Sequence, residues 1–235
     1  MINITHHRYC IIGQPRCGSH HLESYIYNQL SVNNHNTIKI GEFLHWWSSR
    51  FSRFKLDNGT IINVPVGDPL DYALDHQHRI EMLKNSNKDQ PIVARLFFTD
   101  NLLVNFKSLA NIYLEAGFKL VYIKRKIDFQ IISWYFSKDE KKWSLSIFEN
   151  KKIIDIDLLK AYIVDYVKDQ LYGERWLSTV EHECVDYEEL SAYSSMYFKM
   201  MPDDPYSLII NKDEVKEVFT NYLPLVQRQL SSLIS

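Results

Sequence analysis

The sequence predicts a single α/β domain over residues 1–235, with a central parallel sheet flanked by helices. Three observations lead to this prediction. Short apolar runs alternate along the chain with longer segments of helical periodicity, which is the pattern of successive βα units. The 235 residues, 46% of them hydrophobic and 24% charged, can bury one sizeable core and do not have the composition of a disordered chain. The first apolar run ends in a glycine-containing turn before a helix, an arrangement that binds phosphate in many α/β proteins.

The first half of the chain supplies the first βα unit and the insertions after it. The run ending at Gly13 is typical of a buried strand, and the next helix places Leu22, Ile26 and Leu30 on one face. An Asp-Asn-Gly turn at 57–59 predicts a hairpin. The elements expected here are a strand over 8–13, a helix over 18–30, a short strand over 37–40, an aromatic-faced helix over 42–54, hairpin arms over 54–56 and 60–62, and a helix over 69–83.

The second half continues the alternation of strands and helices. Gly117 ends one helix, because glycine readily adopts the left-handed C-cap, and Pro224 interrupts the last one. The elements expected are strands over 91–97, 118–124 and 182–185, and helices over 101–116, 127–138, 155–179 and 213–233.

Charge and cysteine content restrict the partners. A net charge of −2 gives no overall attraction to nucleic acid or to an anionic membrane, so any anion site must be local. No apolar run is long enough to cross a membrane. The three cysteines, Cys10, Cys17 and Cys184, lack the spacing of a disulfide framework or a zinc knuckle, which favours a reducing cytoplasm. Adjacent histidines at 6–7 and 20–21 have no carboxylate cluster to complete a metal site, so no metal is expected.

The first motif is QPRCGSHH, residues 14–21. Gly13 and Gly18 fit the Walker A spacing, G-x-x-x-x-G-K-[ST], but Ser19 stands where that pattern has its lysine. A strand-to-helix turn presents N–H groups and the positive end of the helix dipole to a phosphate. Arg16 lies inside the turn and offers a cation in place of the missing lysine. The alternative is an ordinary glycine-containing turn.

The second motif lies within 118–137. Arg125 stands at the carboxyl end of a predicted strand, and Ser133 follows eight residues later on the next helix. Ligands of open α/β sheets bind at such strand ends, and a guanidinium with a hydroxyl suits a second phosphate. The alternative is a basic surface cluster over 124–126 beside an amphipathic helix.

Together these segments resemble the donor-binding motifs of sulfotransferases. Residues 14–21 are similar to the 5′-phosphosulfate loop, P-[RK]-S-G-[ST]-[ST], with Cys17 replacing its serine and His20 its second hydroxyl residue. The second segment is similar to the 3′-phosphate motif, R-[ND]-P-x-D-x-x-x-S-x-[YWF], which Asp128, Trp134 and Tyr135 also match, whereas Lys126 and Ile127 replace Asn-Pro. Residues 183–190, ECVDYEEL, resemble the family's V-x-Y-E-[DE]-L segment, which is mainly structural.

The resemblance implies a P-loop nucleotide kinase-like fold and transfer of a sulfuryl group from 3′-phosphoadenylyl sulfate (PAPS) to a hydroxyl, with adenosine 3′,5′-bisphosphate as the product. Arg125 and Ser133 would hold the 3′-phosphate, and Arg16 would also stabilise charge on the bridging oxygen. The residues expected to bind the 5′-phosphosulfate are Arg16, Cys17, Gly18, Ser19 and His20. The expected acceptor is a carbohydrate or another small polar metabolite, and the helices allow a homodimer.

The general base is expected to be Glu42. Many cytosolic sulfotransferases use a histidine on the strand after the first βα unit, but Phe97 occupies that place here. The bacterial trehalose sulfotransferase-like branch instead has a glutamate some twenty residues after the loop, which Glu42 matches, and aromatic neighbours would favour its neutral form. His45 and His20 are the alternatives. Arg95 matches a strand lysine of the same branch.

Three other interpretations stay open. Cys17 at a helix N-terminus could act as a nucleophile, although a serine substitute whose backbone binds the ligand is the simpler role. The same fold could serve a nucleotide-dependent kinase using ATP and Mg²⁺. The chain could also be a non-catalytic nucleotide-binding relative, because a C-terminal G-x-x-G-x-W-K loop is missing from the sequence.

Overall fold

A computed structural model describes residues 4–34, 36–44, 52–55, 61–64, 72–98, 105–139, 150–192 and 204–234. Its centre is a five-stranded sheet in the order β2-β5-β1-β6-β7, and every pair of neighbouring strands in it is parallel. The strands are β1 (Arg8–Gly13), β2 (Ile38–Gly41), β5 (Ile92–Phe97), β6 (Lys119–Lys124) and β7 (Glu183–Asp186). The predicted parallel α/β architecture is therefore confirmed.

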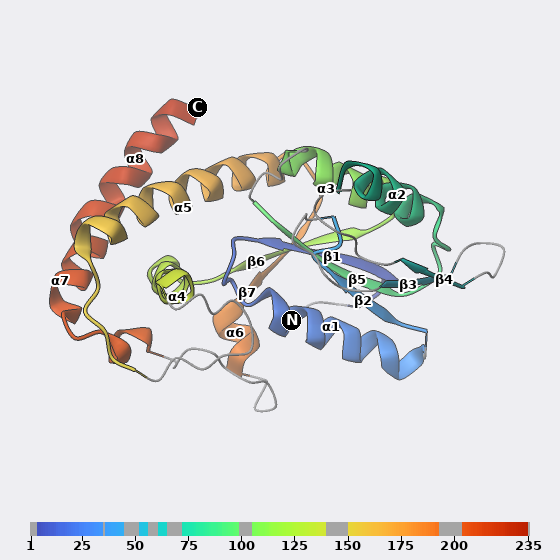
Figure 1. Cartoon of the computed structure of the whole chain (residues 1–235), viewed down its shortest axis with the longest axis horizontal. Helices are drawn as coiled ribbons and strands as arrows, with labels where there is room; N and C mark the ends of the chain where they lie inside the picture. The colour runs from blue at the N-terminus through green and yellow to red at the C-terminus, as the bar shows by residue number, and fades with distance from the viewer. Residues whose placement is uncertain are drawn as a thin grey trace.

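Helices cover both faces of this sheet, because parallel strands need crossover connections (Figure 1). One face carries α2 (Tyr72–Asn85), α3 (Phe106–Glu115) and the C-terminal end of α5 (Ile156–Leu177), and the other carries α1 (Ser19–Asn33) and α6 (Tyr187–Ala192). Successive side chains of a strand point to opposite faces. In β5, for example, Ala94 and Leu96 join the core under α3, whereas Val93 joins the core under α1.

A second hydrophobic core lies beside the sheet, at the N-terminal half of α5. It is formed with α4 (Ile127–Asp139), a 3-10 turn η2 (Pro205–Leu208), α7 (Lys212–Glu217) and α8 (Leu223–Ile234). The long helix α5 contributes to both cores, because Trp176 and Leu177 at its end pack with the sheet. A π-helical turn η3 (Val218–Tyr222) precedes Pro224, as expected where proline cannot donate its backbone hydrogen bond.

The helix boundaries follow local chemistry. Asn105 and Asp155 cap α3 and α5 by accepting hydrogen bonds from the N–H groups of Ser108 and Leu158. Gly117, with φ of 82°, ends α3 as predicted. No helix in the described ranges is long and apolar enough to span a bilayer.

Two predicted elements are wrong in part. The helix expected over 101–116 begins only at Phe106, after the extended N-cap Asn105, and residues 101–104 lie outside the described residues. The helix expected over 42–54 cannot include its last residues, because β3 (Ser52–Lys55) pairs antiparallel with β4 (Ile61–Val64). The predicted hairpin is thereby confirmed, and its first strand begins two residues earlier than expected. Residues 42–44 form a bend and turn instead of a helix, and 45–51 lie outside the described residues.

Candidate functional site

The connection from β1 to α1 has an unusual backbone. Arg16 has φ of 70° and Gly18 has φ of 93°, and α1 begins at the next residue. A positive φ is uncommon for a residue other than glycine, and such strain is typical of functional sites. The turn brings the positive end of the α1 dipole to the carboxyl end of β1. Gly13 at the end of β1 is closely packed, since an added Cβ would lie 3.0 Å from Cys17 Sγ and 3.1 Å from the Ile123 carbonyl oxygen.

The topology also favours a site at this point. The chain leaves β1 toward β2 on one side of the sheet and leaves β6 toward β7 on the other. Ligands of open α/β sheets bind outside the carboxyl ends of strands where the connections diverge in this way. In this sheet that position lies between the ends of β1 and β6.

Two arginines meet there. Arg125 follows β6, and its Nη1 donates to the carbonyl oxygen of Arg16 at 2.9 Å. Arg16 Nε in turn donates to Ser133 Oγ on α4 at 3.1 Å. Burial and the charge of Arg125 lower the pKa of Arg16 to about 10, so the Arg16 guanidinium remains charged at neutral pH. The structure therefore brings Arg16, Arg125 and Ser133 together.

Not all of the Arg125 donors are used within the described residues. Arg125 Nε is buried and has no hydrogen-bond partner among the described residues. Two neighbouring guanidiniums repel each other, and an anion with several acceptor oxygens would relieve that repulsion and satisfy the open donor. The arrangement can bind a phosphate or sulfate group.

The third sequence motif completes this region. The Arg125 guanidinium carbon lies 4.6 Å from the centre of the Tyr187 ring, within cation–π distance. Tyr187 also packs on the loop, because a Cβ added to Gly18 would lie 2.1 Å from Tyr187 Cδ2. The backbone N–H of Lys126 donates to the Glu188 carboxylate at 3.2 Å. The three motifs thus meet at one place in the fold.

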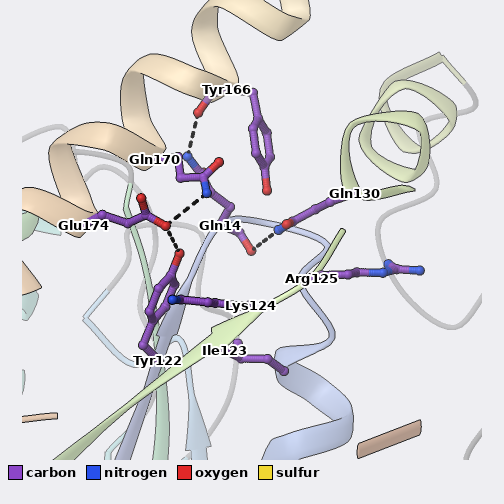
Figure 2. A pocket seen from close by; sticks show the side chains of 9 residues that line it. All are labelled: Gln14, Tyr122, Ile123, Lys124, Arg125, Gln130, Tyr166, Gln170 and Glu174. Carbon is purple, nitrogen blue, oxygen red and sulfur yellow. Dashed lines mark hydrogen bonds between the residues drawn. The ribbon is translucent and has the colours of Figure 1, made fainter. Parts of the chain in front are cut away.

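A polar cavity of about 120 Å³ lies between the loop and α5, and side chains that line it hold the loop in place. Gln14 Nε2 donates to the Tyr166 carbonyl oxygen at 3.0 Å, and Gln130 Nε2 donates to the carbonyl oxygens of Gln14 and Pro15 at 3.2 and 3.0 Å. Figure 2 shows these side chains around the cavity, with the Arg125 guanidinium pointing away from it. The two glutamines fix the loop backbone between α4 and α5.

The far wall of the cavity is acidic. Tyr122 Oη and Gln170 Nε2 both donate to Glu174 Oε1, at 2.5 and 3.1 Å (Figure 2). Burial and the neighbouring Glu174 charge raise the pKa of Tyr122, so the phenol stays protonated. The buried Gln14 Oε1 has no hydrogen-bond partner in the described part of the chain. The cavity therefore offers acceptors to a hydrogen-bond donor, such as water.

The predicted base, Glu42, lies directly after β2 and is paired with Arg95. Arg95 Nη1 is 3.2 Å from Glu42 Oε1, and Arg95 Nε is 3.4 Å from Glu23 Oε2 on α1. The carboxylate of Glu42 therefore faces a guanidinium, a contact that the sequence did not predict. Two aromatic residues that follow Glu42 in the sequence, Trp46 and Trp47, lie outside the described residues, as does His45.

Cys17 and Ser19 are buried and contact each other within the loop. Cys17 is fully buried, and burial raises the pKa of its thiol to about 11 even though the Ser19 backbone and hydroxyl donate to the sulfur. A protonated, inaccessible thiol is unsuited to nucleophilic attack. His20 is exposed, and its Nδ1 lies 4.0 Å from Glu23 Oε2.

Several motif matches have structural roles. Asp128 accepts a hydrogen bond from Tyr206 Oη at 2.9 Å, which joins α4 to η2. Tyr135 Oη accepts from the backbone N–H of Asp155 at 3.0 Å. Trp134 stacks on Tyr162 with ring centres 6.0 Å apart. These three side chains position α4, and thereby Ser133.

Two residues that contribute to the site were not identified from the sequence. Glu23 and Gln130 are charged or polar, yet they are almost fully buried. A signal for Glu23 was present, because it lies one residue after Leu22 and three before Ile26, within the buried stripe of α1. Gln130 gave no comparable signal.

Comparisons of the chain with protein-family models, with curated proteins and with solved structures found no match.

Proposed function

We propose that this protein is a PAPS-dependent sulfotransferase with the P-loop nucleotide kinase-like fold of that family. The observation that carries the proposal is the meeting of Arg16, Arg125 and Ser133 beside the α1 N-terminus. A nucleotide with phosphate groups at both its 3′ and 5′ positions needs two anion subsites a short distance apart. The loop with the α1 N-terminus supplies one, and the Arg125/Ser133 pair supplies the other.

The bound donor would change the partners of Arg16. Its Nε now donates to Ser133, and a phosphosulfate oxygen in the loop would offer a stronger, charged acceptor. Ser133 Oγ would then be available as a donor to the 3′-phosphate. Gln14 and Gln130 hold the loop backbone in place while these contacts are exchanged.

In the transfer step an acceptor hydroxyl oxygen forms a bond to sulfur while the bond between sulfur and the bridging oxygen breaks. The acceptor proton goes to the Glu42 carboxylate, and the electron pair of the broken bond stays on the 5′-phosphate of the leaving bisphosphate. Arg16 stabilises the charge that grows on that phosphate. The acceptor class carried by this proposal is a carbohydrate or other small polar metabolite.

Calorimetric titration of the wild-type protein with adenosine 3′,5′-bisphosphate, ATP and AMP tests the donor site. We expect micromolar binding of the bisphosphate and much weaker binding of the other two. Arg125→Ala should lower the bisphosphate affinity by about 10- to 100-fold, since hydrogen bonds to a charged group contribute roughly 1.5–3 kcal/mol.

Lys126→Ala is the matched control, because it removes the same charge from the next, exposed position and should have little effect. Binding of ATP without the bisphosphate would favour a kinase-like activity. Absence of binding by all three nucleotides would favour a non-catalytic role for the fold.

A further inference from the structure

A buried cluster of three charged side chains lies under the N-terminal part of α1. Arg95 on β5 stands between two carboxylates, with its Nε 3.4 Å from Glu23 and its Nη1 3.2 Å from Glu42. The Arg95 and Glu23 side chains are 3% and 2% exposed, and that of Glu42 is 16% exposed. The cluster thus places two carboxyl groups around one guanidinium, almost out of contact with water.

The contacts within the cluster are loose. Both distances are within ion-pair range, yet neither Arg95 Nε nor Nη1 is aligned for a hydrogen bond with a described residue, and Glu23 Oε1 also lacks a partner. Burying charges is costly unless their hydrogen bonds are satisfied, so a cluster of this kind contributes little to stability compared with apolar residues of similar size. Its presence next to the loop suggests another role.

Sharing the guanidinium has a chemical consequence. A single Arg–Glu pair would strongly favour the Glu42 carboxylate and make it a poor proton acceptor. When Glu23 is ionised, its carboxylate competes with Glu42 for the Arg95 guanidinium. Its negative charge also opposes the ionisation of Glu42. We propose that Glu23 is a positioning residue that acts through Arg95 to orient Glu42 and keep it basic enough to take the acceptor proton. This inference rests on the proposed sulfotransferase function.

Other charged or titratable groups surround the cluster. Arg79 on α2 donates to the Phe43 carbonyl oxygen at 2.9 Å, and Tyr113 on α3 interacts electrostatically with Glu42. On the α1 side, Cys17 interacts electrostatically with Arg95, His20 lies 4.0 Å from Glu23, and Lys39 donates to Ser24 Oγ. These groups are the same in every variant below, so they do not affect a comparison among the variants.

The test is a ¹³C NMR titration of the full-length protein labelled at the glutamate carboxyl carbons, with the Glu42 signal assigned from Glu42→Gln. In Glu23→Gln, Arg95 has one carboxylate partner left, so the titration midpoint of Glu42 should fall by about one pH unit. In Arg95→Met the attractive charge is gone, so the midpoint should rise by a similar amount.

Glu115→Gln, which removes the carboxylate of an exposed pair with Lys84, is the control and should leave the midpoint unchanged. An unchanged midpoint in Glu23→Gln, or shifts of the same sign in both cluster variants, would overturn the inference. If Glu23→Gln does not fold, Glu23→Asp retracts the charge by one methylene and should give a smaller shift in the same direction. The titration needs no substrate, so the bisphosphate experiment on the wild-type protein decides the proposed function separately.

Discussion

Substitution of Gly18 by alanine should damage the loop through two separable effects. Gly18 has φ of 93°, a left-handed backbone that costs an L-residue about 1–2 kcal/mol. The new Cβ would also lie 2.1 and 2.3 Å from two ring carbons of Tyr187, and overpacking of this kind costs roughly 1–3 kcal/mol. Gly18→Ala should therefore lower the free energy of unfolding by about 2–5 kcal/mol, a large part of the 5–15 kcal/mol typical of a domain.

Gly117→Ala separates the two effects. Gly117 has a similar φ of 82°, but an added Cβ would meet no atom within 4 Å. This control should cost only the strain, about 1–2 kcal/mol. Urea unfolding followed by tryptophan fluorescence measures both variants.

Equal losses in the two variants would contradict the packing of Tyr187 on the loop. In a Tyr187→Ala background, the cost of Gly18→Ala should fall to that of Gly117→Ala, because the clash has been removed.

Three further predictions concern other parts of the molecule. Gly173→Ala on α5 would place a Cβ 2.3 Å from the Phe98 ring, so this variant should have a lower melting temperature despite the better helix propensity of alanine, and a stabilised variant would contradict the packing. Cys17 has a pKa of about 11 in the folded protein against an ordinary value of 9.0, so its contribution to stability is complete below pH 9 and is lost as pH rises from 9 to 11, by on the order of 2 kcal/mol. Buried groups such as Cys10 and Tyr122 also have raised pKa values, so both variants lose stability between pH 8 and 11, but the wild type should lose more than Cys17→Ser by about this amount. Glu42→Gln should reduce sulfuryl transfer to a panel of sugar acceptors by about 100-fold or more while bisphosphate binding persists, and full activity would rule out Glu42 as the base.

The sheet and most of its helices were predictable because their signals are local. Apolar runs such as 118–124 mark strands buried on both faces, and Gly117 and Asp155 mark helix ends by their own chemistry. The N-cap Asn105 was not recognised, so the helix before Gly117 was expected to begin too early. The helix expected over 42–54 failed because its aromatic spacing fits a helical period, whereas cross-strand pairing of Phe54 with Ile62 determines the structure there.

The candidate site was predictable only where its residues belong to sequence motifs. Arg16, Arg125 and Ser133 were identified in this way, although the sequence could not predict that they contact one another. The pairing of Glu23 with Arg95 depends on how α1 packs across β5, and these residues are far apart in the chain. The strand order that brings β5 beside β1 is likewise a tertiary property.

The central position of β1 has a consequence for how the chain folds. Tyr9 pairs with Val93 on one side and with Lys119 on the other, so β1 is synthesised before both of the strands with which it pairs. Such non-local pairing slows folding and leaves an apolar, β-prone segment exposed on the nascent chain. An N-terminal fragment ending before residue 92 would contain the whole loop sequence but neither of the strands that flank β1. The loop geometry should therefore form late, when β1 is enclosed, so that ligand binding would report on completion of the sheet.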